Sequence, residues 1–130
     1  ELISRLSFSV KKNARIGVIG KNGRGKSTLL RLLAGELSPR QGEVRLHEHG
    51  RLGYFGQTNV QRLALEKTVE QEVQEANQQL GRTQVRSICG AMMFGGSKAE
   101  KKIGVLSGGE RSRVLLGKLL ATPTNLLLLD

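Results

Sequence analysis

Apolar and polar positions in the first half of the chain alternate between short branched runs and turns. Residues 15–19 form an apolar run that ends at glycine, which is typical of a buried strand in a parallel sheet. The glycine-rich stretch 20–28 follows, and residues 29–34 are strong helix formers closed by another glycine. Two further short runs, 44–46 and 52–55, predict strands. This half of the chain therefore predicts strands around one glycine loop and one helix.

The period changes from residue 68 onward. Thr68 and Gln71 have the spacing of a capping box, which predicts a helix start. Apolar residues then recur on one face of that helix, at Val69, Val73, Ala76 and Leu80. A second helix is expected after Thr83, so residues 68–94 read as a small helical insertion.

A serine and two glycines open the last expected helix. Ser107, Gly108 and Gly109 precede helix formers, and Pro123 ends the run. The four leucines 126–129 then predict a fully buried strand that ends at Asp130. Strands interleaved with helices in this order predict an α/β fold.

Composition narrows the class of protein. The chain has 130 residues, one domain's worth, with 38% hydrophobic and 25% charged residues. It has no run of eighteen apolar residues, which argues against direct membrane insertion. Cys89 has no second cysteine to pair with, so a reducing cytoplasm is the expected compartment. Because Cys89 lies in an apolar stretch, we expect a buried thiol.

The formal net charge of +10 favours anionic partners, either a nucleotide or a nucleic-acid backbone. The alternative is a solvated basic surface. Aromatic residues make up only 3% of the chain, so recognition of single strands by base stacking is poorly supported.

The glycine loop carries the first candidate chemistry. Gly20, Gly25, Lys26 and Ser27 satisfy the pattern G-x-x-x-x-G-K-S, between an expected strand and an expected helix. Glycines let backbone N–H groups point at a phosphate, and the helix adds its positive N-terminal end. Lys26 is placed to reach the outer phosphates and the Ser27 hydroxyl to bind Mg²⁺. The alternative is a glycine-rich turn that matches by chance.

Two further positions fit a nucleotide site. Asp130 ends an apolar strand, where a P-loop protein places a carboxylate that acts on Mg²⁺ mainly through water; the alternative is a carboxylate that caps a strand. The helix start at Ser107–Gly109 could hold a second phosphate, or Ser107 could be a plain N-cap. One nucleotide needs only one such helix start, so the second is expected to serve a nucleotide of a neighbouring subunit or domain.

Four motifs together resemble a known family. Gly20–Thr28, Gln57, Leu106–Glu110 and Leu126–Asp130 are similar to the Walker A, Q-loop, signature and Walker B motifs of the ATP-binding cassette (ABC) superfamily, in the same order. The resemblance covers the whole chain. It implies a RecA-like P-loop core over 1–67 and 107–130, a helical subdomain over 68–106, and a second cassette, in cis or in trans, that packs head to tail around ATP.

The resemblance also implies roles for individual residues. Lys26 and Gln57 would be catalytic, and for Gln57 this role is implied by the resemblance alone. Mg²⁺ would be held by Ser27, Gln57 and Asp130. ATP would contact both the loop and the signature, through Gly20, Asn22, Gly23, Gly25, Lys26, Ser27, Thr28, Ser107, Gly108, Gly109 and Glu110.

Details of the motifs resemble the ABC-F group, cytoplasmic proteins with two cassettes in one chain, many of which act on ribosomes. The signature reads LSGGERSRV where transporters usually have glutamine, and 21–24 and 53–57 are also similar to this group. Two alternatives stay open: the ATP-binding subunit of an ABC transporter, and a nucleotide-binding interaction module without turnover.

The chain also departs from the family pattern at its ends. The family's catalytic glutamate follows the Walker B aspartate, whereas this sequence stops at Asp130, and the aromatic residue that stacks on adenine would precede Glu1. We therefore expect a piece of a longer, truncated cassette, which binds nucleotide but is nearly inactive on its own.

Overall fold

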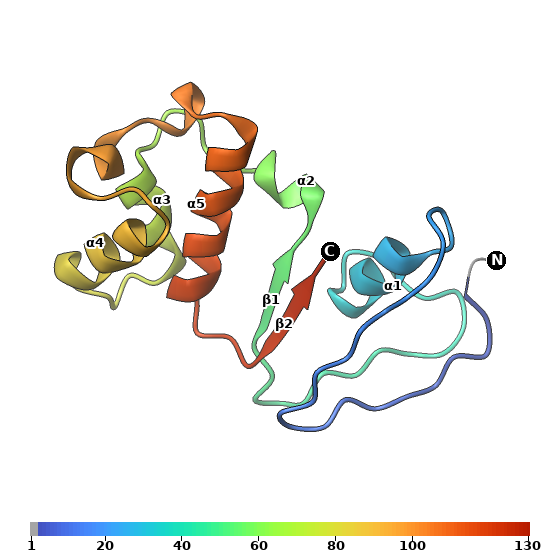
Figure 1. The fold of residues 1–130 in the computed structure, drawn as a ribbon. Coiled ribbons are helices and arrows are strands. Elements are labelled where there is room, and N and C mark those ends of the chain that lie inside the picture. The colour runs from blue at the N-terminus through green and yellow to red at the C-terminus, as the bar shows by residue number, and fades with distance from the viewer. Residues whose placement is uncertain (1–2) are drawn as a thin grey trace. The chain divides into compact units, whose positions relative to one another are not determined.

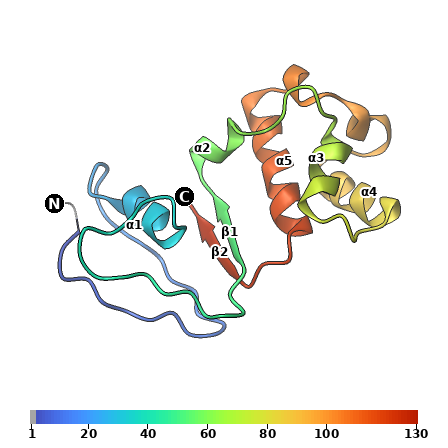
Figure 2. The same cartoon turned by 180° about the vertical axis from the view of Figure 1, so that it is seen from behind.

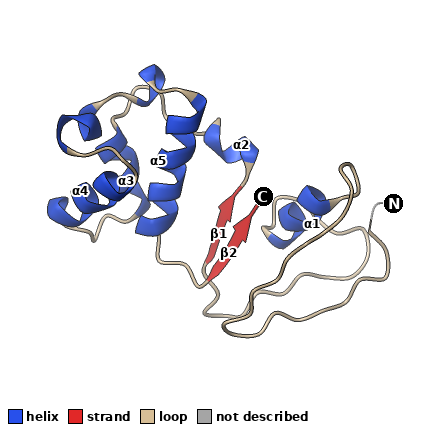
Figure 3. Cartoon of the chain, viewed as in Figure 1, coloured by secondary structure: helices blue, strands red, loops and turns tan. Residues whose placement is uncertain are grey.

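The computed structural model describes residues 3–130, apart from the side chains of Gln57 and Thr58. It divides them into two compact units, residues 3–46 and 47–130, and each is described by itself below (Figure 1). The second unit combines helices with a parallel pair of strands, so the predicted α/β class is confirmed (Figure 3).

The first unit contains the helix α1, Lys26–Leu33. Gly25 precedes it in the left-handed region, at φ 89°, and Gly35 follows its C-cap at φ 75°. Only glycine adopts such angles without strain, so two glycines set both ends of the helix. The predicted helix and its closing glycine are confirmed.

The strands expected at residues 15–19 and 44–46 are not formed. In the described part of the chain, neither segment pairs with another strand, and Ile16, Val18 and Ile19 are exposed instead of buried. A strand exists only through hydrogen bonds to a neighbour. The local pattern shows that these residues suit burial, but it cannot supply a partner.

The second unit contains a parallel pair of strands, β1 (Leu52–Phe55) and β2 (Leu126–Leu129). Asn125 fixes where they begin: its side-chain oxygen accepts from Arg51 N–H at 2.7 Å, and its own N–H donates to the Arg51 carbonyl at 2.9 Å. Leu52 pairs with Leu126 and Phe55 with Leu129. The register therefore brings the carboxyl ends of both strands to one edge.

Both strands were predicted, but the full burial expected of 126–129 is wrong. Leu128 is buried, whereas Leu127 and Leu129 are 51% and 60% exposed. Alternate side chains of a strand point to opposite faces, so Leu127 and Leu129 share the face opposite to Leu128. Four leucines in a row could not reveal that difference.

Helices make up the rest of the second unit. They are α2 (Gln57–Val60), α3 (Val69–Ala76), α4 (Arg82–Ala91), η1 (Gly96–Glu100), η2 (Ile103–Val105) and α5 (Gly108–Ala121). Helices α3, α4 and α5 lie side by side in opposite views (Figures 1 and 2). Among residues 3–130, no helix combines the length and the apolar character needed to cross a membrane.

The three packed helices enclose one apolar core. Its members include residues from α3, α4, η2 and α5, namely Val69, Val73, Val85, Cys89, Ile103 and Val114, each with no more than 1% of its surface exposed. The prediction that Cys89 is buried is confirmed, and this burial raises the pKa of its thiol. Domain boundaries at 67 and 107 remain a prediction, although α5 contributes to this core.

The ends of these helices follow local side-chain chemistry. Thr68 and Gln71 form the predicted capping box of α3, and Ser107 and Glu110 form one for α5. Helix α4 begins at Arg82 rather than after Thr83, because Gln84 accepts a hydrogen bond from the Gly81 N–H at 2.9 Å and so caps the helix two residues earlier than expected.

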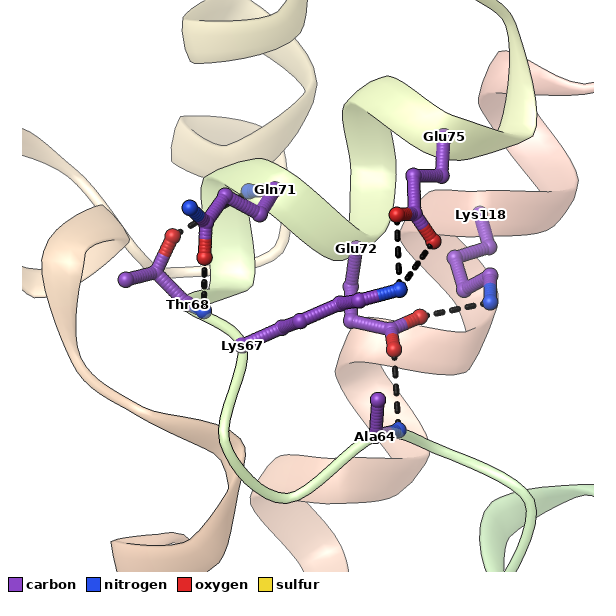
Figure 4. A network of polar contacts seen from close by, with 7 residues as sticks. All are labelled: Ala64, Lys67, Thr68, Gln71, Glu72, Glu75 and Lys118. Carbon is purple, nitrogen blue, oxygen red and sulfur yellow. Dashed lines mark hydrogen bonds and ion pairs between the residues drawn. The ribbon is translucent and has the colours of Figure 1, made fainter.

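One charged side chain is buried among these helices. Glu72 of α3 is 2% exposed, and its carboxylate accepts from Lys118 Nζ of α5 at 2.6 Å and from Ala64 N–H at 2.9 Å (Figure 4). Lys67 forms a separate ion pair with Glu75, which lies on α3 like Glu72. Glu72 thus connects two helices and the segment that follows α2.

Candidate functional site

The glycine loop of the first unit folds around the side chain of Lys26. The Lys26 ammonium donates to the carbonyl oxygens of Gly20 and Lys21, at 2.7 and 2.9 Å. Gly23 and Gly25 take left-handed angles, φ 76° and 89°. The loop therefore bends back over the lysine and presents it at the start of α1.

This loop brings together groups that suit an anionic ligand. A side chain at Gly23 or Gly25 would be strained by the backbone angle alone, which explains the need for glycine. The start of α1 contributes backbone N–H groups and the positive end of the helix dipole. Lys26 adds a full positive charge, so the donors here suit a polyanion.

The second unit gathers other candidate residues at the carboxyl edge of β1 and β2. Asp130 follows β2 and its N–H donates to the Phe55 carbonyl at 2.9 Å. Gln57 follows β1 after Gly56 and opens α2; its side chain lies outside the described part. The parallel register thus brings the backbones of Asp130 and Gln57 to the same edge.

Tyr54 also lies at this edge, and sequence reasoning missed it. Its hydroxyl donates to Asp130 Oδ2 at 3.4 Å, and its carbonyl accepts from Asn59 Nδ2 at 2.9 Å. The partners Tyr54 and Asp130 are 76 residues apart. Only the strand register could have revealed the contact, because no local pattern connects positions so far apart.

The signature residues form the exposed start of α5. Ser107 Oγ accepts from Glu110 N–H at 3.3 Å, while Glu110 Oε2 accepts from Ser107 N–H at 2.8 Å. The backbone hydrogen bond from Ser107 lowers the pKa of Glu110 below its ordinary value of 4.5. Gly108 and Gly109 are exposed, with open space where side chains would stand. The start of the helix is therefore both capped and accessible.

Backbone hydrogen bonds connect the segment just before the signature to the segment after α2. Gly104 N–H donates to the Leu65 carbonyl and Ile103 N–H to the Lys67 carbonyl, both at 2.9 Å. An isolated antiparallel bridge joins Thr68 to Lys102. The segment that follows Gln57 and α2 is thus hydrogen-bonded to the segment that precedes the signature.

The predicted site residues divide between the two units. The loop residues Gly20–Thr28 belong to the first unit, and Gln57, Leu106–Glu110 and Asp130 belong to the second. Within the second unit, Asp130 and Gln57 meet at one sheet edge, while the signature stands at the start of α5. Their roles toward ATP and Mg²⁺ remain predictions.

Comparison with known proteins identifies the family. The model of the family described as ABC transporter matches residues 3–130. The Probable ATP-binding protein YheS of Haemophilus influenzae is 38% identical over 100% of this chain and 20% of the relative. ABC transporter F family member 5 of Arabidopsis thaliana is 38% identical over 99% of the chain and 19% of the relative.

The Energy-dependent translational throttle protein EttA of Escherichia coli is 41% identical over 99% of this chain and 24% of the relative. The chain thus spans between 19% and 24% of the length of these relatives. Each match covers nearly the whole chain and includes all four motifs. The chain therefore belongs to the ABC transporter family, and within that family it is most like the ABC-F group.

Proposed function

We propose that this chain is part of an ATP-binding cassette of an ABC-F ATPase, which acts in the cytoplasm. It binds Mg-ATP, and in the intact protein the cassette hydrolyses ATP to drive a conformational step on the ribosome. A second cassette completes each ATP site. Residues 1–67 and 107–130 belong to a RecA-like core, and residues 68–106 form its helical subdomain.

The observation that carries this proposal is the geometry of the glycine loop. Lys26 lies across the loop carbonyls, two glycines take left-handed angles, and α1 starts directly after them. Lys26 holds the outer phosphates, while the N–H groups at the start of α1 hold the rest. ABC domains bind ATP, and this loop is where the family binds its phosphates.

Oxygen donors of the chain would hold the metal. Mg²⁺ prefers hydroxyl and carboxylate oxygens, which Ser27 and Asp130 supply, and it neutralises charge on the phosphates during transfer. Gln57 orients the attacking water. The exposed signature, Ser107–Glu110, faces the ATP of the second cassette.

Two observations support a ribosomal partner. One relative is named as a translational throttle protein, and translation takes place on ribosomes. The net charge of +10 also suits a partner rich in phosphate. A transporter subunit would need a membrane partner. Apart from the family name "ABC transporter", the names of the relatives given above mention no such partner.

The first test is ATP binding by the 130-residue chain. ATP with Mg²⁺ at about 100 times its dissociation constant should stabilise the wild type by roughly 2.7 kcal/mol. Lys26→Ala should still fold. It should lose most of this stabilisation, because it loses the charge that holds the outer phosphates. Lys21→Ala removes the same charge from the same loop and serves as the matched control.

A Lys26→Ala variant with a full ATP-induced thermal shift would show that the loop does not bind phosphate as proposed.

The same samples test turnover. These 130 residues, assayed without a second cassette, should hydrolyse ATP far below the roughly 1–100 per second of ordinary phosphotransfer enzymes. A rate within that range would exclude the proposed need for further residues and a second cassette.

A further inference from the structure

The edge where β1 and β2 end holds one aromatic side chain whose position is fixed from several sides. Tyr54 pairs with Leu128 in the sheet, and its carbonyl accepts from Asn59 Nδ2 in α2. Its hydroxyl donates to Asp130 Oδ2 at 3.4 Å. The backbone of Tyr54 is thus held by the sheet and by α2, while its hydroxyl reaches the Walker B carboxylate.

Gly56 leaves the space that the Tyr54 ring occupies. A Cβ atom at Gly56 would lie 2.6 Å from Tyr54 Oη and 2.7 Å from Cζ, closer than atoms approach. The backbone of Gly56 has φ −124°, which any residue adopts. Glycine is therefore needed here for the space of the ring rather than for its own conformation.

We infer that Tyr54 is a positioning residue for Asp130, holding one carboxylate oxygen so that the other is directed to the Mg²⁺ ion and its water. The inference rests on the proposed function, since Asp130 must act on Mg-ATP. The Asp130 side chain is exposed, and Oδ2 is the oxygen that Tyr54 contacts. A donor on Oδ2 selects one orientation, and the phenol carries no charge that would compete with the metal.

The chain offers a direct spectroscopic signal for this contact. Tyr54 is the only tyrosine, and the sequence has no tryptophan, so the emission of the protein comes from Tyr54. A phenol that donates to a carboxylate has quenched emission. Asp130→Asn and Gly56→Ala should therefore both increase it, the first by removing the carboxylate and the second by displacing the ring. Glu66→Gln, which changes a different exposed carboxylate, should leave it unchanged.

The functional test uses Tyr54→Phe, which removes the hydroxyl and keeps the ring over Gly56. We measure the affinity of Mn²⁺ for the ATP-loaded chain by electron paramagnetic resonance, and the affinity of ATP in EDTA. Tyr54→Phe should weaken Mn²⁺ binding about fivefold, the size expected from one hydrogen bond, with metal-free ATP binding unchanged. In the Asp130→Asn background, Tyr54→Phe should have no further effect.

The outcomes separate this inference from the proposed function. If the wild type shows no ATP-dependent Mn²⁺ site, the proposed function fails and the inference fails with it. If Asp130→Asn weakens Mn²⁺ binding but Tyr54→Phe matches the wild type, the proposed function stands and the positioning role is overturned. Equal losses from Tyr54→Phe in both backgrounds would also overturn it, because the effect would not pass through Asp130.

Discussion

At the scale of single residues, the buried carboxylate of Glu72 depends on its hydrogen-bond partners Lys118 and Ala64. Its side chain is 3% exposed and that of Lys118 is 28% exposed, so Lys118 can reach water but Glu72 cannot. Removing either partner therefore has unequal consequences. A buried charge that loses its counter-charge costs more than a half-exposed charge that becomes hydrated.

We predict that Lys118→Met lowers the unfolding free energy by about 3 kcal/mol, because it removes the charged partner of the buried Glu72 carboxylate and leaves it the hydrogen bond from Ala64 N–H. Glu72→Gln should cost about 1 kcal/mol, since the amide oxygen still accepts from Ala64 and Lys118 turns to water. Urea unfolding followed by circular dichroism measures both.

The double variant Glu72→Leu with Lys118→Met sharpens this test. It removes both charges together, so it should be less destabilised than Lys118→Met alone. Lys101→Met, a change at an exposed lysine, is the control for loss of charge. If the double variant is the least stable of the set, the pair stabilises the fold beyond what its burial costs, and this account of Glu72 is wrong.

At the scale of elements, the two capping boxes set where α3 and α5 begin. Thr68 Oγ1 accepts from Gln71 N–H at 3.2 Å, and Ser107 Oγ accepts from Glu110 N–H at 3.3 Å. Thr68→Ala and Ser107→Ala should each lower the unfolding free energy by about 1 kcal/mol, because each leaves an N–H group of the first turn unpaired.

Replacement by a residue that still caps provides the control. Thr68→Ser and Ser107→Thr keep the hydroxyl and should stay within about 0.5 kcal/mol of the wild type in urea unfolding. If Ser107→Ala unfolds like the wild type, the hydroxyl does not stabilise α5. Ser107 would then be available for nucleotide alone.

The same comparison shows which elements the sequence could predict. The capping box of α3, the start of α5 at Ser107 and the end of α5 before Pro123 depend on residues a few positions apart, so the local pattern found them. The strand at 15–19 depends on a distant partner, and its prediction failed. Tyr54 with Asp130 and Glu72 with Lys118 join residues 76 and 46 positions apart, which no periodicity can reveal. The roles of the loop and signature residues came from the family resemblance and remain to be tested.

At the scale of the second unit, several carboxylates favour folding only while they are charged. A hydrogen bond from Arg86 lowers the pKa of Glu70, and one from Lys67 lowers the pKa of Glu75, below the ordinary 4.5. The hydrogen bond from the Ser107 N–H likewise lowers the pKa of Glu110. Because the folded pKa values are depressed, this contribution is present above about pH 4.5 and is lost as the pH falls through the folded values.

We therefore predict that the urea midpoint of the helical unit falls as the pH is lowered through these depressed pKa values, below about 4.5. Lys67 has a raised pKa, so its contribution is lost only at alkaline pH, above 10.5. Repulsion among the basic residues also grows in acid, so the cause must be separated from net charge. Glu75→Gln and Glu110→Gln should each reduce the slope of the urea midpoint against pH in acid, because each removes a carboxylate whose pKa depends on folding. Glu66→Gln changes the net charge equally and serves as the control for net charge. Equal slopes in all three variants would assign the acid effect to general repulsion rather than to these contacts.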